Sequence, residues 1–258
     1  MNKVTAEIIK QEFLIEDIYS MWLKCPTVAA EAHSGQFVSV YSKDSSRLLP
    51  RPISICEIDK KGGSIRLVYR TVGAGTKEFS KYKKGETLDI IGPIGNGYDL
   101  SSSKPVLMGG GIGIPPMLQL AREFSQKGLS KDDITVILGY RDNTFLLNEF
   151  KKLATVYISS DTGSVGTKGT VIDAAREHGV NGDMIYSCGP KPMLRAVKAY
   201  AYEKDVDAQI SLEERMACGI GACLACVCKT TEKDEHSQVN NKRICVDGPV
   251  FRVDEVEL

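Results

Sequence analysis

The chain has 258 residues, of which 42% are hydrophobic and 26% charged, as in an ordinary soluble globular protein. Its 33 basic residues balance its 33 acidic residues, so no overall field draws it to nucleic acid or to an anionic membrane. No apolar run approaches the roughly 20 residues that a membrane span needs, and the N-terminus lacks the apolar block of a secretory signal. We therefore expect a cytoplasmic protein that binds neither nucleic acid nor membrane.

Residues 1–99 contain a series of short β-rich runs. These runs have period-two character and are separated by turn residues such as Gly62-Gly63 and Gly92-Pro93. Only residues 76–82 have helical character in this part of the chain. The pattern predicts a small antiparallel β barrel. The predicted strands are 3–15, 18–25, 36–42, 51–58, 64–72 and 86–95.

Residues 100–210 instead alternate short apolar strands with helical stretches. Strand–helix repeats of this length predict a parallel sheet covered by helices, which is an α/β domain of the nucleotide-binding type. The predicted strands are 104–110, 133–140, 155–161 and 183–189, and the predicted helices are 117–128, 146–153, 171–179 and 192–205.

Residues 211–258 are distinguished by their cysteines. The spacing Cys218-x4-Cys223-x2-Cys226, with Cys245 farther along the chain, is the plant-type ferredoxin arrangement of four thiolates around a 2Fe-2S cluster. The loop must wrap tightly around the cluster, and glycines at 219 and 221 allow the unusual backbone angles that this requires. We therefore predict a C-terminal cluster-binding domain.

Two alternatives concern this tail. A structural zinc site with four cysteines usually pairs two short C-x2–4-C arms, so the asymmetric spacing favours iron and sulfide over zinc. Cys228 could replace Cys226 as a ligand, but we expect it on the strand that leaves the loop, facing away from the cluster. The polar run 232–241 is expected to form a solvated hairpin turn without chemistry.

An Arg-Pro-x-Ser tetrapeptide, residues 51–54, lies between two predicted barrel strands. On its own it would be an ordinary turn, but Val68-Tyr69-Arg70 follows on a later strand, and residues 73–76 (Gly-Ala-Gly-Thr) open the short helix. A glycine turn that leads into a helix presents free N–H groups to a phosphate. Arg51 and Arg70 would supply complementary charge for a pyrophosphate.

A glycine-rich segment, residues 109–113, follows the first strand of the second domain and precedes Pro115 and Pro116. The prolines exclude the G-x-G-x-x-G fingerprint, yet a strand-to-helix glycine turn still suits a phosphate, and proline suits a first helical turn. Asp142, after the second strand, could bind a ribose hydroxyl and favours NAD over NADP, although the adjacent Arg141 weakens this argument.

In this order, these elements resemble the ferredoxin–NAD(P)H reductase superfamily, whose C-G-P-x-x-M element is similar to residues 188–193. Residues 34–37 (Ser-Gly-Gln-Phe) resemble a further family element. With its cysteine tail, the whole chain resembles the electron-transfer subunits of type B dihydroorotate dehydrogenases, with Ala225 as one departure where the family usually has Gly. The resemblance implies that Ser54 approaches the flavin ring and Cys188 the nicotinamide, as catalytic residues. It implies cofactor binding by Arg51, Pro52, Ile53, Ser54, Val68, Tyr69, Arg70, Gly75, Thr76, Gly110, Gly111 and Gly113, and metal binding by Cys218, Cys223, Cys226 and Cys245.

The resemblance also implies a relay in pyrimidine (UMP) biosynthesis. Electrons from dihydroorotate would pass from FMN in a catalytic partner subunit through the 2Fe-2S cluster and FAD of this chain to NAD+, in a heterotetramer with two copies of each subunit. No dyad that could deprotonate dihydroorotate is recognisable in this chain. The alternatives are a reductase subunit of the same architecture that serves a hydrogenase, sulfite reductase or ferredoxin, and a flavin-free module with structural zinc.

Overall fold

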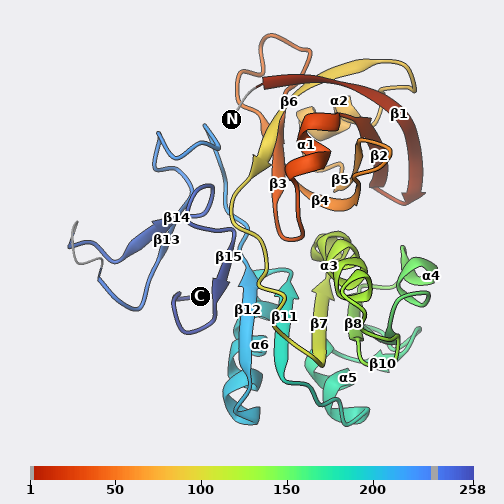
Figure 1. Cartoon of the computed structure of the whole chain (residues 1–258), viewed down its shortest axis with the longest axis vertical. Coiled ribbons are helices and arrows are strands. Elements are labelled where there is room, and N and C mark those ends of the chain that lie inside the picture. Colours follow the sequence, from red (N-terminus) through yellow and green to blue (C-terminus); the bar gives the residue numbers. More distant parts are fainter. Residues whose placement is uncertain (1–2, 234–237) are drawn as a thin grey trace.

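The first unit in the computed structural model, which describes residues 3–233 and 238–258, is a closed antiparallel barrel (Figure 1). Its strand order is β1-β2-β5-β4-β3-β6, and alternate side chains such as Ile8, Leu67 and Ile90 fill the interior. The predicted barrel is therefore confirmed. The strands are β1 (Lys3–Ile15), β2 (Ile18–Lys24), β3 (Phe37–Val40), β4 (Arg51–Asp59), β5 (Ser64–Arg70) and β6 (Thr87–Ile94).

Two short helices accompany the barrel. The predicted helix over 76–82 forms as α2 (Ala74–Phe79), which starts two residues earlier because Gly73 provides its N-cap. Helix α1 (Pro26–Glu31) was not predicted. Its single apolar turn, with Val28 and Ala29 buried, is too short to produce a helical period in the sequence.

The second unit is a seven-stranded sheet in the order β10-β9-β8-β7-β11-β12-β15. All its neighbouring strands pair in parallel except β12 and β15, so the predicted parallel sheet is confirmed with one antiparallel edge strand. The strands are β7 (Pro105–Gly110), β8 (Thr135–Tyr140), β9 (Thr155–Ser160), β10 (Thr167–Lys168), β11 (Met184–Cys188), β12 (Asp207–Ser211) and β15 (Val250–Arg252).

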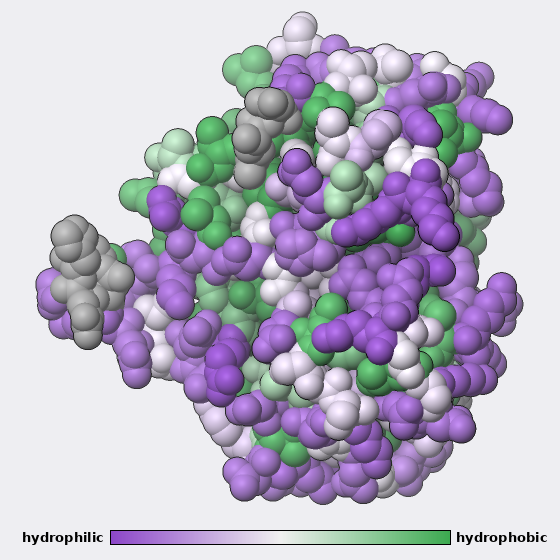
Figure 2. Space-filling model, in the orientation of Figure 1, coloured by the Kyte–Doolittle hydropathy of each residue, from purple (hydrophilic) through white to green (hydrophobic). Residues whose placement is uncertain are grey.

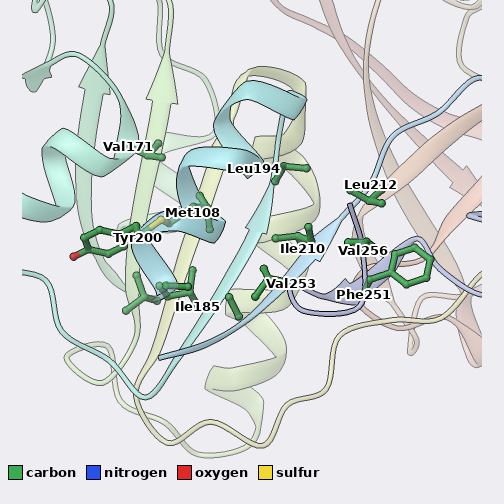
Figure 3. Packing of buried hydrophobic residues seen from close by; sticks show 14 of the residues in the cluster. Met108, Val171, Ile185, Leu194, Tyr200, Ile210, Leu212, Phe251, Val253 and Val256 are labelled. Atoms are coloured by element: carbon green, nitrogen blue, oxygen red, sulfur yellow. The ribbon is translucent and has the colours of Figure 1, made fainter. Parts of the chain in front are cut away.

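Helices cover both faces of this sheet, because its strands are apolar on both sides. On β7, Leu107 packs with Leu118 of α3, whereas the next residue, Met108, packs in the opposite cluster with Leu194 of α6 (Figure 3). The helix predicted at 146–153 forms only as a single turn. It begins after Leu146, because that residue has a φ of 59° and is not helical. The elements are η1 (Gly111–Gly113), α3 (Ile114–Gln126), α4 (Leu147–Phe150), α5 (Val171–Glu177) and α6 (Lys191–Lys204).

The remaining unit contains little regular structure. Its two strands, β13 (Val227–Lys229) and β14 (Asn241–Arg243), form a small antiparallel pair. The chain then returns to the nucleotide sheet, where β15 pairs with β12 and places Phe251 in the core of that sheet. Part of the predicted 211–258 domain thus completes the sheet of its neighbour. Residues 234–237 of the predicted hairpin turn lie outside the described residues.

Within the described ranges, no helix is both long and apolar enough to cross a membrane.

Candidate functional site

A cavity of about 270 Å³ lies where the barrel, the nucleotide sheet and the start of the cysteine-rich tail meet. Its barrel wall is formed by neighbouring strands, because Phe37 of β3 pairs with Ser54 of β4. The facing wall is formed by Ile112 of η1 and by residues 211–214 and 216. Five residues predicted to contact the flavin line this cavity together: Pro52, Ile53, Ser54, Tyr69 and Arg70.

Of the three β5 residues predicted to bind a cofactor, Tyr69 and Arg70 line the cavity and Val68 does not. Tyr69 lines the cavity, and its hydroxyl accepts a hydrogen bond from Gln11 Nε2 at 2.9 Å. Burial raises the pKa of the Tyr69 hydroxyl, which therefore stays protonated at neutral pH. The side chain of Val68 instead packs into the apolar cluster that contains Ile18 and Cys56. Val68 can therefore contribute to the cavity only through its backbone.

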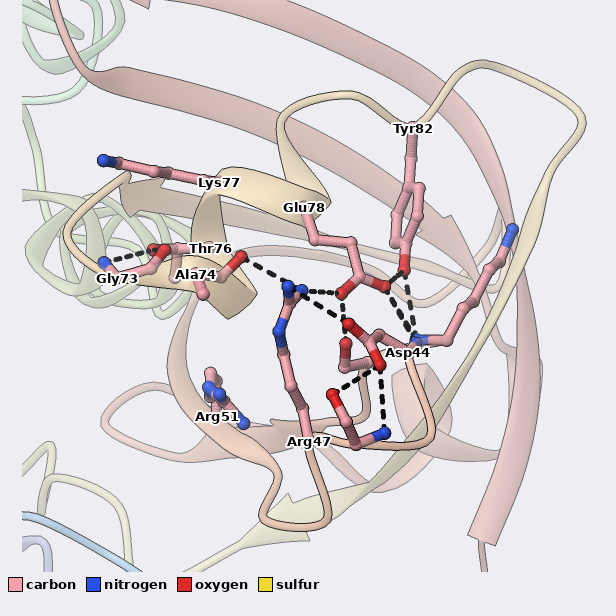
Figure 4. A network of polar contacts seen from close by, with 12 residues as sticks. Asp44, Arg47, Arg51, Gly73, Ala74, Thr76, Lys77, Glu78 and Tyr82 are labelled. Carbon is pink, nitrogen blue, oxygen red and sulfur yellow. Dashed lines mark hydrogen bonds and ion pairs between the residues drawn. The ribbon is translucent and has the colours of Figure 1, made fainter.

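Arg51 stands against the first turn of α2 (Figure 4). A Cβ atom on Gly75 would lie 2.5 Å from Arg51 Nε, so the absence of a side chain lets the guanidinium approach the helix start. Thr76 Oγ1 accepts hydrogen bonds from the N–H groups of Val72 (3.0 Å) and Gly73 (3.3 Å). A guanidinium and a helix N-terminus side by side make a positively charged cradle that suits a phosphate.

Glu78, at the other end of α2, ties this helix to the loop that precedes Arg51. Its carboxylate accepts hydrogen bonds from the Ser42 and Tyr82 hydroxyls, from the Lys43 N–H and from the Arg47 guanidinium (Figure 4). Burial alone would raise the pKa of Glu78, but the hydrogen bonds from Ser42, Tyr82 and the backbone outweigh it and lower this pKa to about 2. The loop and α2 are therefore held together by an ionised carboxylate.

The predicted nicotinamide elements pack against each other through their glycines. A Cβ atom on Gly113 would lie 2.3 Å from the carbonyl oxygen of Cys188, and one on Gly110 would lie 2.3 Å from Met193 Sδ. Gly111 has a φ of +54° and faces open space. The two glycine-containing turns therefore form one surface at the carboxyl edge of the sheet, where doubly wound folds bind nucleotides.

A second cavity, of about 350 Å³, opens beside Gly111. Arg70 of the barrel and Asp142, which follows β8, both line it, and Asp142 Oδ1 accepts a hydrogen bond from Thr162 Oγ1 at 3.1 Å. The turn between β1 and β2 contributes Glu16 and Asp17, which sequence reasoning did not single out. Nothing in their local sequence shows that this barrel turn meets the nucleotide domain.

Two titratable groups flank the first cavity, the buried thiol of Cys188 and the exposed carboxyl of Glu213. Cys188 ends β11 opposite Ser211, and burial, assisted by the charge of Glu213, raises the pKa of its thiol. Glu213 lines the cavity, and desolvation by the surrounding cavity wall raises the pKa of its carboxyl although the charge of Arg70 opposes the shift. Glu213 was missed by sequence reasoning. Glu213 follows the carboxyl end of β12, where parallel sheets bind ligands, and a prediction of that strand would have indicated it as a site residue.

Four cysteines of the tail lie in two pairs. Cys223 Sγ accepts a hydrogen bond from the Cys218 N–H at 3.5 Å, and Cys218 Sγ accepts one from the Ile220 N–H at 3.4 Å. Burial alone would raise the pKa of Cys218, but hydrogen bonds from Ile220 and Cys223 lower it to about 6. The other pair is buried: burial and then the Cys226 thiol raise the pKa of Cys245 to about 12.

The loop around these thiols has the backbone angles that the sequence predicted, with φ values of +69° at Gly219 and +85° at Gly221. Cys228 lies apart on β13, and its thiol donates to the Lys242 carbonyl oxygen of β14 at 3.5 Å. Among the described residues, no three His, Cys, Asp or Glu side chains converge as one metal ion would require. Two thiol pairs suit a cluster of two irons better than a single zinc ion.

Apolar side chains surround the cysteine loop on its solvent side. Ile220, Leu224 and Val246 are 53%, 64% and 39% exposed, and each lies next to or near a cysteine in sequence. Figure 2 shows hydrophobic surface gathered over the loops above β13 and β14. Exposed apolar groups in such numbers around one loop are typical of a surface that binds another protein.

Two family models match the chain. Residues 213–257 match the iron-sulfur cluster binding domain of dihydroorotate dehydrogenase B, and residues 107–199 match the oxidoreductase NAD-binding domain. A dihydroorotate dehydrogenase B (NAD(+)) electron transfer subunit of Listeria monocytogenes is 41% identical over 264 residues, covering 100% of both chains. The subunit of the same name from Fusobacterium nucleatum is 43% identical and covers 95% of both chains.

Two solved structures have a similar fold. An NADH-dependent reduced ferredoxin-NADP oxidoreductase, studied for flavin-based electron bifurcation, superposes with a TM-score of 0.86 at 31% identity, covering 98% of this chain and 89% of that one. Phthalate dioxygenase reductase has a TM-score of 0.64 at 18% identity, covering 95% and 94% of the two chains, which shows a shared fold.

Proposed function

Because the chain belongs to the family of dihydroorotate dehydrogenase B (NAD(+)) electron transfer subunits, we propose that it passes electrons from a catalytic partner subunit to NAD+. The observation that carries the proposal is the continuity of two sites. Residues 211–214 and 216 form one wall of the cavity beside the barrel and lead directly to Cys218. A flavin in that cavity and a cluster on the cysteine loop would therefore be neighbours.

FAD would be held by the barrel. Arg51 and the first turn of α2 would bind the pyrophosphate, since they form a positively charged cradle that a side chain at Gly75 would crowd. Ser54 and Tyr69 would orient the ring from the barrel wall, and the protonated Tyr69 hydroxyl can donate a hydrogen bond. When bound, FAD exchanges a hydride with nicotinamide and single electrons with a 2Fe-2S cluster.

NAD(H) would bind as co-substrate at the carboxyl edge of the sheet. The turn formed by Gly110, Gly111 and Gly113 would take the phosphates, because Gly111 faces open space and the turn directly precedes α3. Cys188 would border the nicotinamide, and Asp142 would bind a ribose hydroxyl from the second cavity. Ile112 lines the first cavity while Gly111 lines the second, so this turn links the two ligands.

The cluster would be held by Cys218, Cys223, Cys226 and Cys245, with two thiolates for each iron. The donor set fits the group, because the two thiol pairs are formed and Gly219 and Gly221 let the loop wrap closely. Cys228 is outside this set, since its thiol is directed to the backbone of β14.

The partner would dock over the cysteine loop. Ile220, Leu224 and Val246 would be covered by an FMN-containing catalytic subunit, in an assembly with two copies of each chain. Docking there would bring the FMN to the cluster, as one-electron transfer between subunits requires.

The test uses the purified chain with and without a dihydroorotate dehydrogenase catalytic subunit. We expect the isolated chain to oxidise NADH with artificial electron acceptors and to leave dihydroorotate unchanged. Adding the partner should make NAD+ an effective acceptor for dihydroorotate, and Cys226→Ser should abolish that coupled reaction while the NADH–dye reaction continues. Dihydroorotate oxidation by the isolated chain, or failure to bind the catalytic subunit, would contradict the proposal and favour a reductase with another partner.

A further inference from the structure

One face of helix α3 makes hydrogen bonds and an ion pair to the barrel, and these contacts join the barrel to the nucleotide unit. Three successive polar contacts come from this face, at helical spacing. Gln119 Oε1 accepts from the N–H of Ile58 on β4 at 2.8 Å, and the Arg122 guanidinium contacts Glu57 of the same strand. Glu123 accepts from both the backbone N–H (3.0 Å) and the hydroxyl (2.6 Å) of Ser34.

Glu57 is the centre of this interface. One carboxylate oxygen binds Arg122 of the nucleotide unit, and the other binds Arg66 of the barrel at 2.7 Å. Arg66 in turn contacts Glu149 of α4 at 2.9 Å and donates to Ser20 Oγ at 2.8 Å. Glu57 and Arg66 are buried, so these contacts are poorly screened by water. Two carboxylates and two guanidinium groups balance in charge, which makes such a network tolerable inside a protein.

The two elements that meet here also carry the two ligand sites. Strand β4 begins with Arg51 and carries Ser54 in the cavity wall, three residues before Glu57. Helix α3 begins immediately after the turn that ends at Gly113. Because both elements are rigid, the bond between Glu57 and Arg122 constrains how far the nicotinamide turn lies from the flavin cavity.

We propose that the Glu57–Arg122 contact, supported by Gln119 and Glu123, is a positioning device that aligns the nicotinamide site with the flavin site for hydride transfer. This inference rests on the proposed function, since it assumes that a hydride passes between the two sites. Charged and directional bonds suit the task because they fix the angle between two packed elements, whereas apolar contacts allow them to slide. A displacement of about 1 Å between reacting groups can cost on the order of a hundredfold in rate.

Arg122→Gln tests the device, with Arg176→Gln as the matched control. Arg176 forms an exposed ion pair with Glu203 at 2.6 Å inside the nucleotide unit, so its loss removes an arginine contact without touching the interface. Flavin reduction by NADH is followed by stopped-flow absorbance over a range of NADH concentrations. We expect the limiting rate of Arg122→Gln to fall by about tenfold or more. FAD content and the half-saturating NADH concentration should change less than about twofold, and Arg122→Lys should restore part of the rate.

Ser34→Ala is the second variant, since it removes only a hydroxyl from the same interface and keeps every charge. It should lower the limiting rate by a smaller factor in the same direction. If Arg122→Gln does not fold, a limiting rate of Ser34→Ala equal to that of the wild type overturns the inference. An unchanged rate in Arg122→Gln, or a rate that falls only in proportion to lost FAD, overturns it as well. In each of these cases the proposed function still stands if the wild-type enzyme reacts with NADH. A wild-type enzyme that does not react with NADH overturns both the proposed function and this inference.

Discussion

The barrel and the cysteine-rich tail reach a defined structure by different means. In the barrel, all six strands close into one ladder, and side chains such as Leu23, Val38 and Ile55 are buried inside it. In the described part of the tail, residues 211–233 and 238–258, the only strands that belong to this unit alone are β13 and β14, of three residues each. Gly219, Gly221 and even Leu224 adopt positive φ in the loop between them and the sheet.

This contrast indicates which of the two units depends on its cofactor for folding. The cysteine loop exposes Ile220 and Leu224 instead of burying them, so we expect ligand bonds to a metal centre, and not packing, to hold its strained turns. The barrel has a complete core without FAD. We therefore expect removal of the cluster to unfold one unit and removal of flavin to leave its unit folded.

The largest expected effect is that of Cys226→Ser. The variant should lose its broad visible absorption, and iron and acid-labile sulfide should fall from about two per chain. Hydrogen exchange should show the amides of the tail unprotected while the strands of the barrel stay protected. Cys228→Ser is the control and should keep the cluster. Loss of the cluster in Cys228→Ser but not in Cys226→Ser would reverse the ligand assignment, and stoichiometric zinc without sulfide would remove it.

A glycine substitution in the nucleotide unit tests a position whose contribution to stability comes from packing and not from metal ligands. In Gly113→Ala the new Cβ would meet the Cys188 carbonyl oxygen at 2.3 Å, and backbone cannot move aside cheaply. We expect a loss of about 3 kcal/mol in the free energy of unfolding, measured by urea denaturation of the flavin-free protein. Gly73→Ala, where a Cβ meets nothing within 4 Å, should stay within about 1 kcal/mol of wild type. Equal losses in the two variants would contradict the packing argument.

Arg51→Ala should affect flavin binding without unfolding the barrel. Removing a charge-assisted bond to phosphate should weaken FAD binding by about 1.5–3 kcal/mol, measured by titrating the flavin-free protein with FAD. Ser54→Ala should instead keep its FAD and reduce more slowly with NADH, because Ser54 lines the cavity rather than the phosphate cradle. Equal FAD occupancy of Arg51→Ala and wild type at limiting FAD counts against the cradle.

The smallest effect concerns Glu78 and depends on pH. The pKa of Glu78 is about 2 in the folded protein, below the value of about 4.3 expected in the unfolded chain. Its stabilisation is therefore present above the unfolded pKa and disappears as the pH falls through the folded pKa. Glu78→Gln should cost about 1–2 kcal/mol at pH 7 and less near pH 3, by urea denaturation of the flavin-free protein. A cost that does not vary with pH would show that packing, not charge, matters there.

Much of this fold could be predicted because its signals are local. The period-two runs gave the barrel strands, and the spacing of Cys218, Cys223 and Cys226 indicated a cluster loop before any geometry was known. Strand β15 escaped prediction, since three residues carry no period and its partner β12 lies far away in sequence. Glu57 and Arg122 escaped for the same reason: each looks like an ordinary surface charge until the barrel and α3 are brought together.

The antiparallel edge of the sheet has a consequence for how the tail could have been acquired. Strands β12 and β15 are adjacent, with Ser211 opposite Val250 and Ile210 opposite Phe251. Topologically they are the two arms of a β-hairpin, and everything between them is its loop. A loop can be lengthened or replaced at small entropic cost as long as its ends stay paired. The cysteine-rich segment is therefore a long insertion between two paired strands, and both of its ends, at Leu212 and Pro249, lie in the wall of the flavin cavity.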